Sequence, residues 1–175
     1  MRDAIEIRDG RPTDLPALER LYPAAFPTED LLPLVRDLVG APDGILSLVA
    51  TRDGEVVGHV AFTRCGVSGR SEPVELLAPL AVVPTLQGQG IGSALVREGV
   101  GRLAAAGGRR MLVAGDPAYY VRFGFEPEEG IAPPYPLPDE WRGAWRGLRL
   151  GDVEPPLAGV LEVPAFWMRP ALWTP

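Results

Sequence analysis

The 175-residue sequence contains no lysine and no asparagine, and it has a single cysteine, Cys65, and a single histidine, His59. One cysteine excludes an internal disulfide, and one cysteine with one histidine excludes a zinc site built from four such ligands. The absence of lysine excludes a Walker A loop, which needs a lysine for its phosphates. Stability must come from packing, and a hydrophobic content of 46% is ample for a core.

Long apolar runs and a basic surface are also missing. No run approaches the roughly 20 residues that span a bilayer, and the opening MRDAIEIRDG lacks the apolar centre of a signal peptide. We therefore expect a cytoplasmic protein without a membrane partner. The formal net charge of −6 argues against a nucleic-acid partner, because neutralising phosphates requires a basic surface. The oligomeric state stays open.

The first part of the chain predicts a short strand, two helices and a hairpin. Thr13 or Asp14 offers an N-cap to the first helix, and Thr28 offers one to the second. Asp53 and Gly54 then join two β-rich segments, and this dipeptide readily takes the positive φ angles of a tight hairpin. These two segments are therefore expected to be antiparallel strands.

The rest of the chain completes an α/β domain. The expected elements are a strand at 74–83, a helix at 90–106, a strand at 109–115, a short helix at 116–123 capped by Asp116, and strands at 145–150 and 158–163. This order predicts a mixed, mostly antiparallel central sheet flanked by helices, with one β-α-β crossover. We expect a single domain at 1–175, with a core at about 5–125 and a strand-rich C-terminal extension at about 126–175.

The most informative stretch is LAPLAVVPTLQGQGIGSALV, residues 77–96. An apolar strand ends here, and Gly88, Gly90 and Gly92 follow before a helical pattern begins. Glycines allow a sharp turn and a close approach of a ligand to backbone amides. The first amides of a helix have no internal partner and favour anions, so the stretch predicts a phosphate or pyrophosphate site. The dinucleotide pattern G-x-G-x-x-G fits less well, because the third glycine comes one residue early.

Gln87, Gly90 and Gly92 form a Gln-x-x-Gly-x-Gly motif directly after the strand. This motif resembles the acetyl-CoA signature of the GNAT-type N-acetyltransferases. Downstream, GDPAYYVRFGF places Tyr120 four residues before Gly124, which is similar to the Tyr-x-x-x-Gly-Phe element of the same family and looks like that of a bacterial subgroup of predicted acetyltransferases. The resemblance covers about 5–125, including the order of elements between the two motifs.

The resemblance implies that acetyl-CoA binds as a co-substrate and that no metal takes part. The turn would hold the pyrophosphate, and the strand before it would bond to the pantetheine arm through main-chain groups. The residues implied in coenzyme binding are Leu80, Ala81, Val82, Gln87, Gly88, Gln89, Gly90, Ile91, Gly92 and Ser93. Proline cannot donate to a sheet ladder, so Pro79 predicts a break in pairing at 78–80. Many relatives have an asparagine near Asp116, so the coenzyme contact made there is in question.

The resemblance also implies a reaction, the transfer of acetyl to a primary amine of a small molecule or protein by direct attack in a ternary complex. The Val82 amide would donate to the thioester oxygen, and Tyr120 would protonate the departing thiolate. Glu75 is the candidate general base, with a solvated strand-end carboxylate as the alternative. A non-catalytic acyl-CoA-binding module is the alternative function.

Three further expectations concern residues outside the motifs. His59 and Cys65 lie six residues apart on one expected strand, roughly 20 Å at about 3.3 Å per residue, so they cannot form a dyad. His59 is expected to pack or hydrogen-bond in the hairpin. Gly99 falls on the apolar face of the helix at 90–106, which predicts a close approach of helix to sheet, whereas Ser93 falls on the polar face. The tail aromatics are expected to pack the C-terminal strands, and the alternative is an acceptor pocket in which aromatics give the shape and acidic side chains bind an amine. The aromatics are Tyr135, Trp141, Trp145, Phe166 and Trp167, and the acidic residues beside them are Glu128, Glu129, Asp139 and Glu140.

Overall fold

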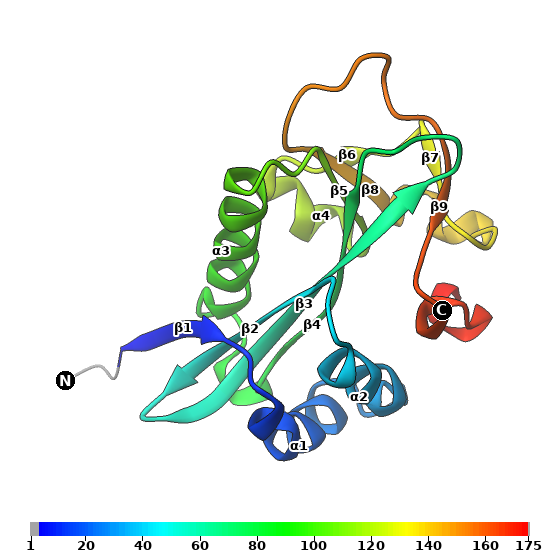
Figure 1. Ribbon diagram of the computed structural model, residues 1–175. Helices are drawn as coiled ribbons and strands as arrows, with labels where there is room; N and C mark the ends of the chain where they lie inside the picture. Colours follow the sequence, from blue (N-terminus) through cyan, green and yellow to red (C-terminus); the bar gives the residue numbers. More distant parts are fainter. Residues whose placement is uncertain (1–3, 175) are drawn as a thin grey trace. The chain divides into compact units, whose positions relative to one another are not determined.

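The computed structural model describes residues 4–174 (Figure 1). The chain divides into two compact units, each built from two separate stretches. The first unit comprises the described part of Met1–Phe62 together with Ala78–Gly101, and the second comprises Thr63–Leu77 with the described part of Arg102–Pro175. The expected division into a core and an extension within one domain stays a prediction.

In its described residues the first unit contains a β hairpin, two neighbouring strands and three α-helices. Its elements are β1 (Ile5–Asp9), α1 (Leu15–Ala25), α2 (Leu32–Gly40), β2 (Ile45–Arg52), the start of β3 (Glu55–Val67), the end of β4 (Val74–Val82) and most of α3 (Ile91–Ala105). The hairpin prediction is confirmed, because Asp53 and Gly54 join β2 to β3 with φ angles of 52° and 78°. β1 pairs antiparallel with β2, from Ile5↔Arg52 to Asp9↔Leu48.

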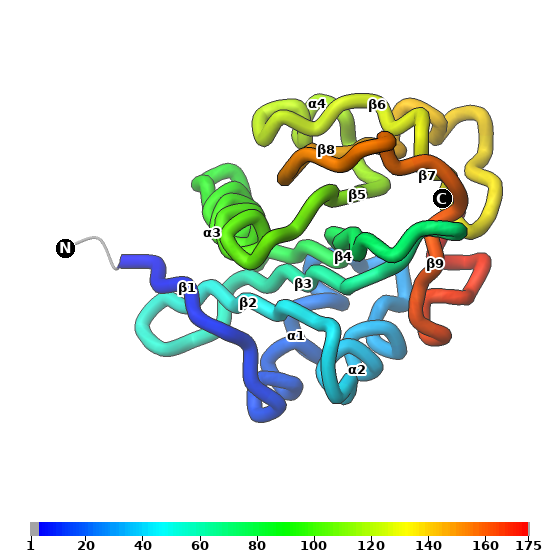
Figure 2. Tube along the Cα trace, turned by 45° about the horizontal axis from the view of Figure 1, so that its top comes forward, coloured from blue at the N-terminus to red at the C-terminus, as the bar shows by residue number. Residues whose placement is uncertain are grey.

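Helices cover both faces of the strands in the first unit. α1 and α2 lie on one face, and α3 lies on the other (Figure 2). The cluster beneath α1 and α2 consists of the buried residues Leu18, Leu21, Tyr22, Val35 and Ala81. On the other face α3 approaches β3 closely, since a Cβ added at Gly99 would collide with the Phe62 ring. The expected close contact at Gly99 is confirmed.

Two details of the helices differ from expectation. Thr28 does not cap α2, which begins at Leu32 with Leu31 in the N-cap position and no side-chain cap. The proline at the second helical position explains the later start, because the residue before a proline is restricted while a proline in the first turn is tolerated. Ser93 is only 9% exposed, so it does not lie on the polar face. The first turn of α3 is buried over more of its circumference than a single apolar stripe predicts.

The second unit contains the remaining strands and a short helix. Its elements include β5 (Arg110–Ala114), α4 (Pro117–Tyr120), β6 (Glu126–Pro127), β7 (Ile131–Ala132), β8 (Trp145–Arg149) and β9 (Gly159–Glu162). β5 runs antiparallel to β8 and parallel to β4, which it pairs at Glu75↔Met111 and Leu76↔Leu112. This pairing lies upstream of Pro79, as the expected break at 78–80 requires. The two-residue strands β6 and β7 were not predicted.

The sequence of paired strands is β1-β2-β3-β4-β5-β8-β6, with β9 pairing β3 and β7. The parallel step from β4 to β5, with α3 between them along the chain, is the predicted β-α-β crossover. The predicted fold class, a mixed and mostly antiparallel sheet flanked by helices, is confirmed. Within residues 4–174, the longest helices are too short or too polar to cross a bilayer.

Aromatic residues pack the C-terminal part of the second unit, as expected. The rings of Trp145 and Trp167 each lie 5.9 Å from the ring of Trp173. Their indole groups are satisfied inside the unit, because Trp145 donates to Ile131 O at 2.7 Å and Trp167 donates to Thr63 Oγ1 at 3.1 Å. Three buried tryptophans therefore anchor a segment that has little regular secondary structure.

His59 is a buried hydrogen-bonding residue of the first unit, as predicted. Its Nδ1 lies 2.6 Å from the Tyr22 hydroxyl and its Nε2 lies 2.9 Å from Ser47 Oγ. Burial lowers the pKa of His59 from 6.5 to about 4, although the Asp14 carboxylate acts in the opposite direction. The imidazole is therefore neutral at pH 7 and joins α1 to β2 and β3.

The low pKa of His59 predicts acid-sensitive folding. Between pH 6.5 and about 4 the unfolded state binds a proton that the native state does not, so stability falls as the pH falls through this window. The loss should reach about 3 kcal/mol. Urea unfolding at pH 7 and pH 4.5 should show most of this difference, and His59→Gln should flatten it. The contribution of Asp14 to this acid sensitivity can be separated from that of His59. Pairing with Arg8 lowers the pKa of Asp14 below 3.8, so the stability that Asp14 contributes is lost at a lower pH.

Candidate active site

The glycine turn has the backbone geometry that its sequence predicts. Gly88 and Gly90 have φ angles of +77° and +87°, in the left-handed region that favours glycine. A Cβ at either position would meet no atom within 4 Å, so conformation rather than lack of space requires glycine there. The first helical hydrogen bond joins Ala94 N to Gly90 O at 3.0 Å. The amides of Ile91, Gly92 and Ser93 precede this bond and lie at the positive end of the 15-residue α3.

The exposed part of the turn is held by one of its own side chains. Gln87 donates from Nε2 to Val82 O at 3.0 Å. This contact ties the start of the turn to the end of β4 and leaves the amides of Gly88 and Gly90 uncovered by the Gln87 side chain. Gln87 to Gly90 are exposed, whereas the Ile91 side chain is only 5% exposed. Ile91 can therefore offer a ligand its amide but not its side chain.

The end of β4 presents main-chain groups in two directions. Val83 N donates to Val57 O at 2.9 Å, so Val83 faces β3. Successive residues of a strand point their main-chain groups to opposite sides, which directs Val82 and Leu80 away from β3 and Ala81 towards it. The Ala81 side chain is 2% exposed in the cluster with α1. Of the three predicted pantetheine-binding residues, Leu80 and Val82 thus have the appropriate orientation.

Tyr120 is held by a tight set of contacts in the second unit. Asp116 caps α4 by accepting from Ala118 N at 3.0 Å, as its sequence position predicts. A Cβ at Gly115 would collide with the Tyr120 ring, so the backbone before α4 touches the ring directly. The rings of Tyr119 and Phe125 lie 5.0 and 5.6 Å from that of Tyr120 in edge-on arrangements. Burial raises the pKa of Tyr120, so its hydroxyl is protonated at physiological pH.

Glu75 is not the solvated carboxylate of the alternative interpretation. It is 4% exposed, and its Oε1 lies 3.6 Å from Arg64 Nε. Burial raises the pKa of Glu75, and the charge and hydrogen bond of Arg64 oppose this shift. Glu75 pairs with Met111, four residues before Gly115 along the chain. At about 3.3 Å per residue this is roughly 13 Å, so the structure does not bring Glu75 next to Tyr120.

Cys65 is not a reactive thiol. It is 6% exposed, and Sγ donates to Thr63 O at 3.4 Å. Burial and the Glu75 charge raise the pKa of Cys65 to about 12, which leaves the thiol protonated at neutral pH. Within the part of the chain that the structure describes, no group of three metal-ligating side chains could hold an ion.

An α/β fold with an exposed glycine turn at the start of a long helix is typical of proteins that bind a phosphate-bearing ligand. A family model described as "Acetyltransferase (GNAT) family" matches residues 15–125, and the chain belongs to this family. The chain is 39% identical over 152 residues to the uncharacterized N-acetyltransferase YhbS of Escherichia coli K12, covering 83% of this chain and 87% of that protein. The predicted family and enzyme class are confirmed.

Solved structures agree with this assignment. YhbS of Escherichia coli in complex with CoA superposes with a TM-score of 0.87 at 33% identity, over 97% of this chain and 94% of that one. A GNAT family acetyltransferase of Brucella melitensis in complex with acetyl-CoA superposes with a TM-score of 0.76 at 32% identity, over 95% and 99%. The uncharacterized N-acetyltransferase YjhQ of Escherichia coli K12 is 42% identical over 105 residues, and the match spans 57% of this chain and 58% of that protein.

Proposed function

We propose that this protein transfers the acetyl group of acetyl-CoA to a primary amine of a small molecule or protein by direct attack in a ternary complex. The observation that carries the proposal is the exposed turn with Gly88 and Gly90 at positive φ before α3. The CoA and acetyl-CoA complexes of the two similar structures support the same ligand here. Acetyl-CoA supplies the activated thioester, and the amides from Gly88 to Ser93 hold its pyrophosphate.

The chain's own groups would then stabilise the negative charge on the thioester oxygen and neutralise the negative charge on the departing sulfur. The Val82 amide donates to the thioester oxygen, and one such preorganised donor contributes on the order of 3 kcal/mol. The Tyr120 hydroxyl gives its proton to the departing thiolate. Glu75 accepts the proton of the incoming ammonium. Because Glu75 does not lie next to Tyr120, this proton passes through water. A raised pKa makes Glu75 a better proton acceptor than an exposed carboxylate.

The turn itself is tested by Gly90→Val. A β-branched residue is strained at a φ of +87°, so the first amides of α3 should be displaced and acetyl-CoA affinity should fall by about tenfold or more. Calorimetric titration with acetyl-CoA measures this effect. Gly101→Val is the matched control, because Gly101 lies on α3 with nothing within 4 Å of an added Cβ. Equal affinity in both variants, or no binding by the parent protein, would refute the assignment of the turn.

The base is tested by Glu75→Gln in acetyl-transfer assays over a panel of amines. Because Glu75 must be ionised to accept a proton, kcat should rise with pH through its raised pKa in the parent protein. Glu75→Gln should lower kcat by about 100-fold at neutral pH and remove that rising limb. An unchanged pH profile in the variant would exclude Glu75 as the base. If the parent protein binds acetyl-CoA but acetylates no amine, the non-catalytic binding module is favoured.

A further inference from the structure

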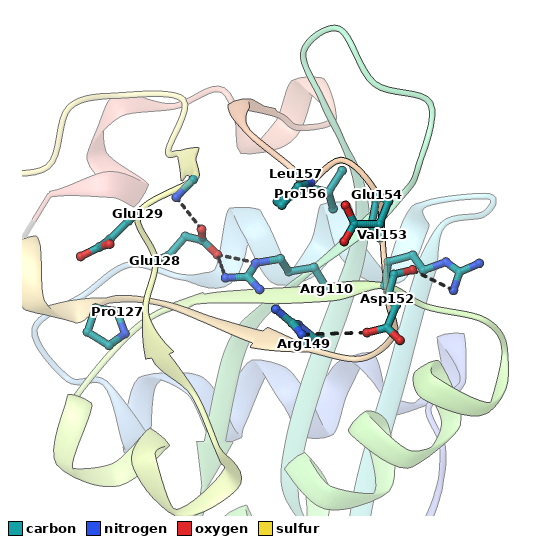
Figure 3. A pocket seen from close by; sticks show the side chains of 13 residues that line it. Arg110, Pro127, Glu128, Glu129, Arg149, Asp152, Val153, Glu154, Pro156 and Leu157 are labelled. Atoms are coloured by element: carbon teal, nitrogen blue, oxygen red, sulfur yellow. Dashed lines mark hydrogen bonds and ion pairs between the residues drawn. The ribbon is translucent and has the colours of Figure 1, made fainter.

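A cavity of about 310 Å³ lies in the second unit, where β5 begins and β8 ends (Figure 3). The segment after β6 and the loop before β9 form its other walls. Gly115, which touches Tyr120, follows the opposite end of β5. The five residues of this strand, at about 3.3 Å each, place the cavity roughly 16 Å from that end. The cavity is therefore separate from the tyrosine proposed for acetyl transfer.

The floor of the cavity is a buried ion pair. The Glu128 side chain is 2% exposed, and its Oε1 accepts from Arg110 Nε at 2.6 Å. Its Oε2 accepts from Gly130 N at 2.9 Å and from Ile131 N at 3.1 Å. Gly147 provides the room for this pair, since a Cβ there would collide with both side chains. Both carboxylate oxygens of Glu128 are thus committed to the structure.

The loop over the cavity is also fixed. Arg70 donates from Nη1 to Pro155 O at 2.8 Å and to Pro156 O at 3.1 Å. On its other side the loop touches the segment after β6, because a Cβ at Gly130 would lie 2.6 Å from Leu157 O. A ligand would therefore enter a preformed cavity and would not have to order a loop.

Positive charge is concentrated on the strand side of the cavity. Arg110 and Arg149 are register partners on β5 and β8, and like charges directly opposite each other are destabilising. Glu128 neutralises Arg110, but Arg149 has only a 3.9 Å contact with Asp152, and these two side chains are 75% and 96% exposed. Such an exposed pair contributes little. Arg109 donates to Asp152 O at 3.4 Å, so Arg109 and Arg149 keep most of their capacity to bind a carboxylate.

Negative charge lies on the loop before β9, which carries Glu154, and on the segment after β6, which carries Glu129. Glu129 and Glu154 line the cavity and are exposed. Among residues 4–174, neither carboxylate has an ion-pair partner. The Glu154 carboxylate lies on the side of the cavity opposite the Arg149 side chain in Figure 3. The cavity therefore offers one ligand weakly paired arginines and unpaired carboxylates.

We propose that this cavity binds a free α-amino acid as a zwitterion. Its carboxylate binds Arg149 and Arg109, for which guanidinium groups are suited by their paired N–H donors. Its ammonium group binds Glu154. A ligand with only negative charge would meet the uncompensated carboxylate of Glu154, and a ligand with only positive charge would meet Arg109 and Arg149. A zwitterion is complementary to both walls.

The test is calorimetric titration of the intact protein, without acetyl-CoA, with three probes that share the glutamine side chain and differ in charge. L-glutamine carries both charges, L-glutamine amide lacks the carboxylate and N-acetyl-L-glutamine lacks the ammonium. L-glutamine should bind at least about tenfold more tightly than either neutralised probe, because a charge-assisted contact is lost in each. Equal binding of all three probes, tighter binding of a singly charged probe, or no binding of L-glutamine would overturn the proposal.

Variants locate the site. Arg149→Gln and Glu154→Gln should each weaken L-glutamine binding by about tenfold or more. Both side chains are exposed, so the fold should tolerate these changes. Arg142→Gln is the matched control, because Arg142 is 79% exposed, pairs with Asp139 and does not line the cavity. Tyr120→Phe should bind L-glutamine like the parent protein, and unchanged binding in the cavity variants would place the ligand elsewhere.

Discussion

Tyr120→Phe is expected to lower kcat for acetyl transfer by about 100-fold or more while leaving acetyl-CoA affinity unchanged, since a positioned general acid contributes 10²–10⁴-fold. The change removes one oxygen and keeps the ring. Gly115, Tyr119 and Phe125 surround that ring, so the packing of the second unit should be retained. Steady-state kinetics on the best amine of the panel, with calorimetry for acetyl-CoA, measure the two quantities separately.

Tyr119→Phe provides the matched control for this experiment. Tyr119 is the neighbouring residue of α4, and its ring lies 4.4 Å from the Arg122 guanidinium. It is less buried than Tyr120, and its contacts explain it as a packing residue. We expect kcat within a few-fold of the parent value. Parent-like turnover of Tyr120→Phe, or an equal loss in both variants, would rule out a specific role for the Tyr120 hydroxyl.

The pKa of Tyr120 adds a pH signature to the same prediction. Burial and the nearby Tyr119 and Asp116 charges raise this pKa, so the hydroxyl remains an available proton donor across the alkaline range. The parent enzyme should therefore show no loss of kcat near pH 10, the ordinary pKa of tyrosine. A fall in kcat near pH 10 in the parent enzyme would contradict this prediction.

Local sequence signals predicted the parts of the site that depend on the backbone. The turn follows from Gly88 and Gly90, whose positive φ angles only glycine adopts easily, and the start of α4 follows from Asp116 and its cap. The hairpin at Asp53 is of the same kind. In each case a few neighbouring residues determine the conformation, so no knowledge of distant contacts is needed.

Properties that depend on distant contacts could not be predicted in the same way. Glu75 has the sequence context of a strand end, yet its side chain is buried and lies beside the exposed Arg64. The hydrogen bond from Gln87 to Val82 O could not be predicted, because it depends on the path of the turn. The cavity between Arg149 and Glu154 combines segments whose approach is fixed by the buried Glu128. Charge and burial at such positions follow from the assembled sheet.

The second large effect is expected in stability, at the contact of Gly99 with Phe62. A Cβ at Gly99 would overlap the ring, so Gly99→Ala must displace either Phe62, which is fully buried, or the helix. Overpacking of this kind costs about 1–3 kcal/mol, and the gain of about 1 kcal/mol in helix propensity offsets only part of it. Gly99→Val adds two more methyl groups and should lower the free energy of unfolding further than Gly99→Ala.

Gly101→Ala separates the packing effect from the propensity effect. Gly101 lies two residues further along α3, and an added Cβ would meet nothing within 4 Å. It should therefore stabilise the protein by up to about 1 kcal/mol, which for a chain of this length raises Tm by about 2–4 °C. Thermal and urea unfolding should show a lower stability for Gly99→Ala and a higher stability for Gly101→Ala.

Phe62→Leu should recover part of the loss when combined with Gly99→Ala, since the smaller side chain vacates the space that the new Cβ needs. Stabilisation by Gly99→Ala alone would mean that helix and strand can separate without loss, and the close contact would then have no energetic role.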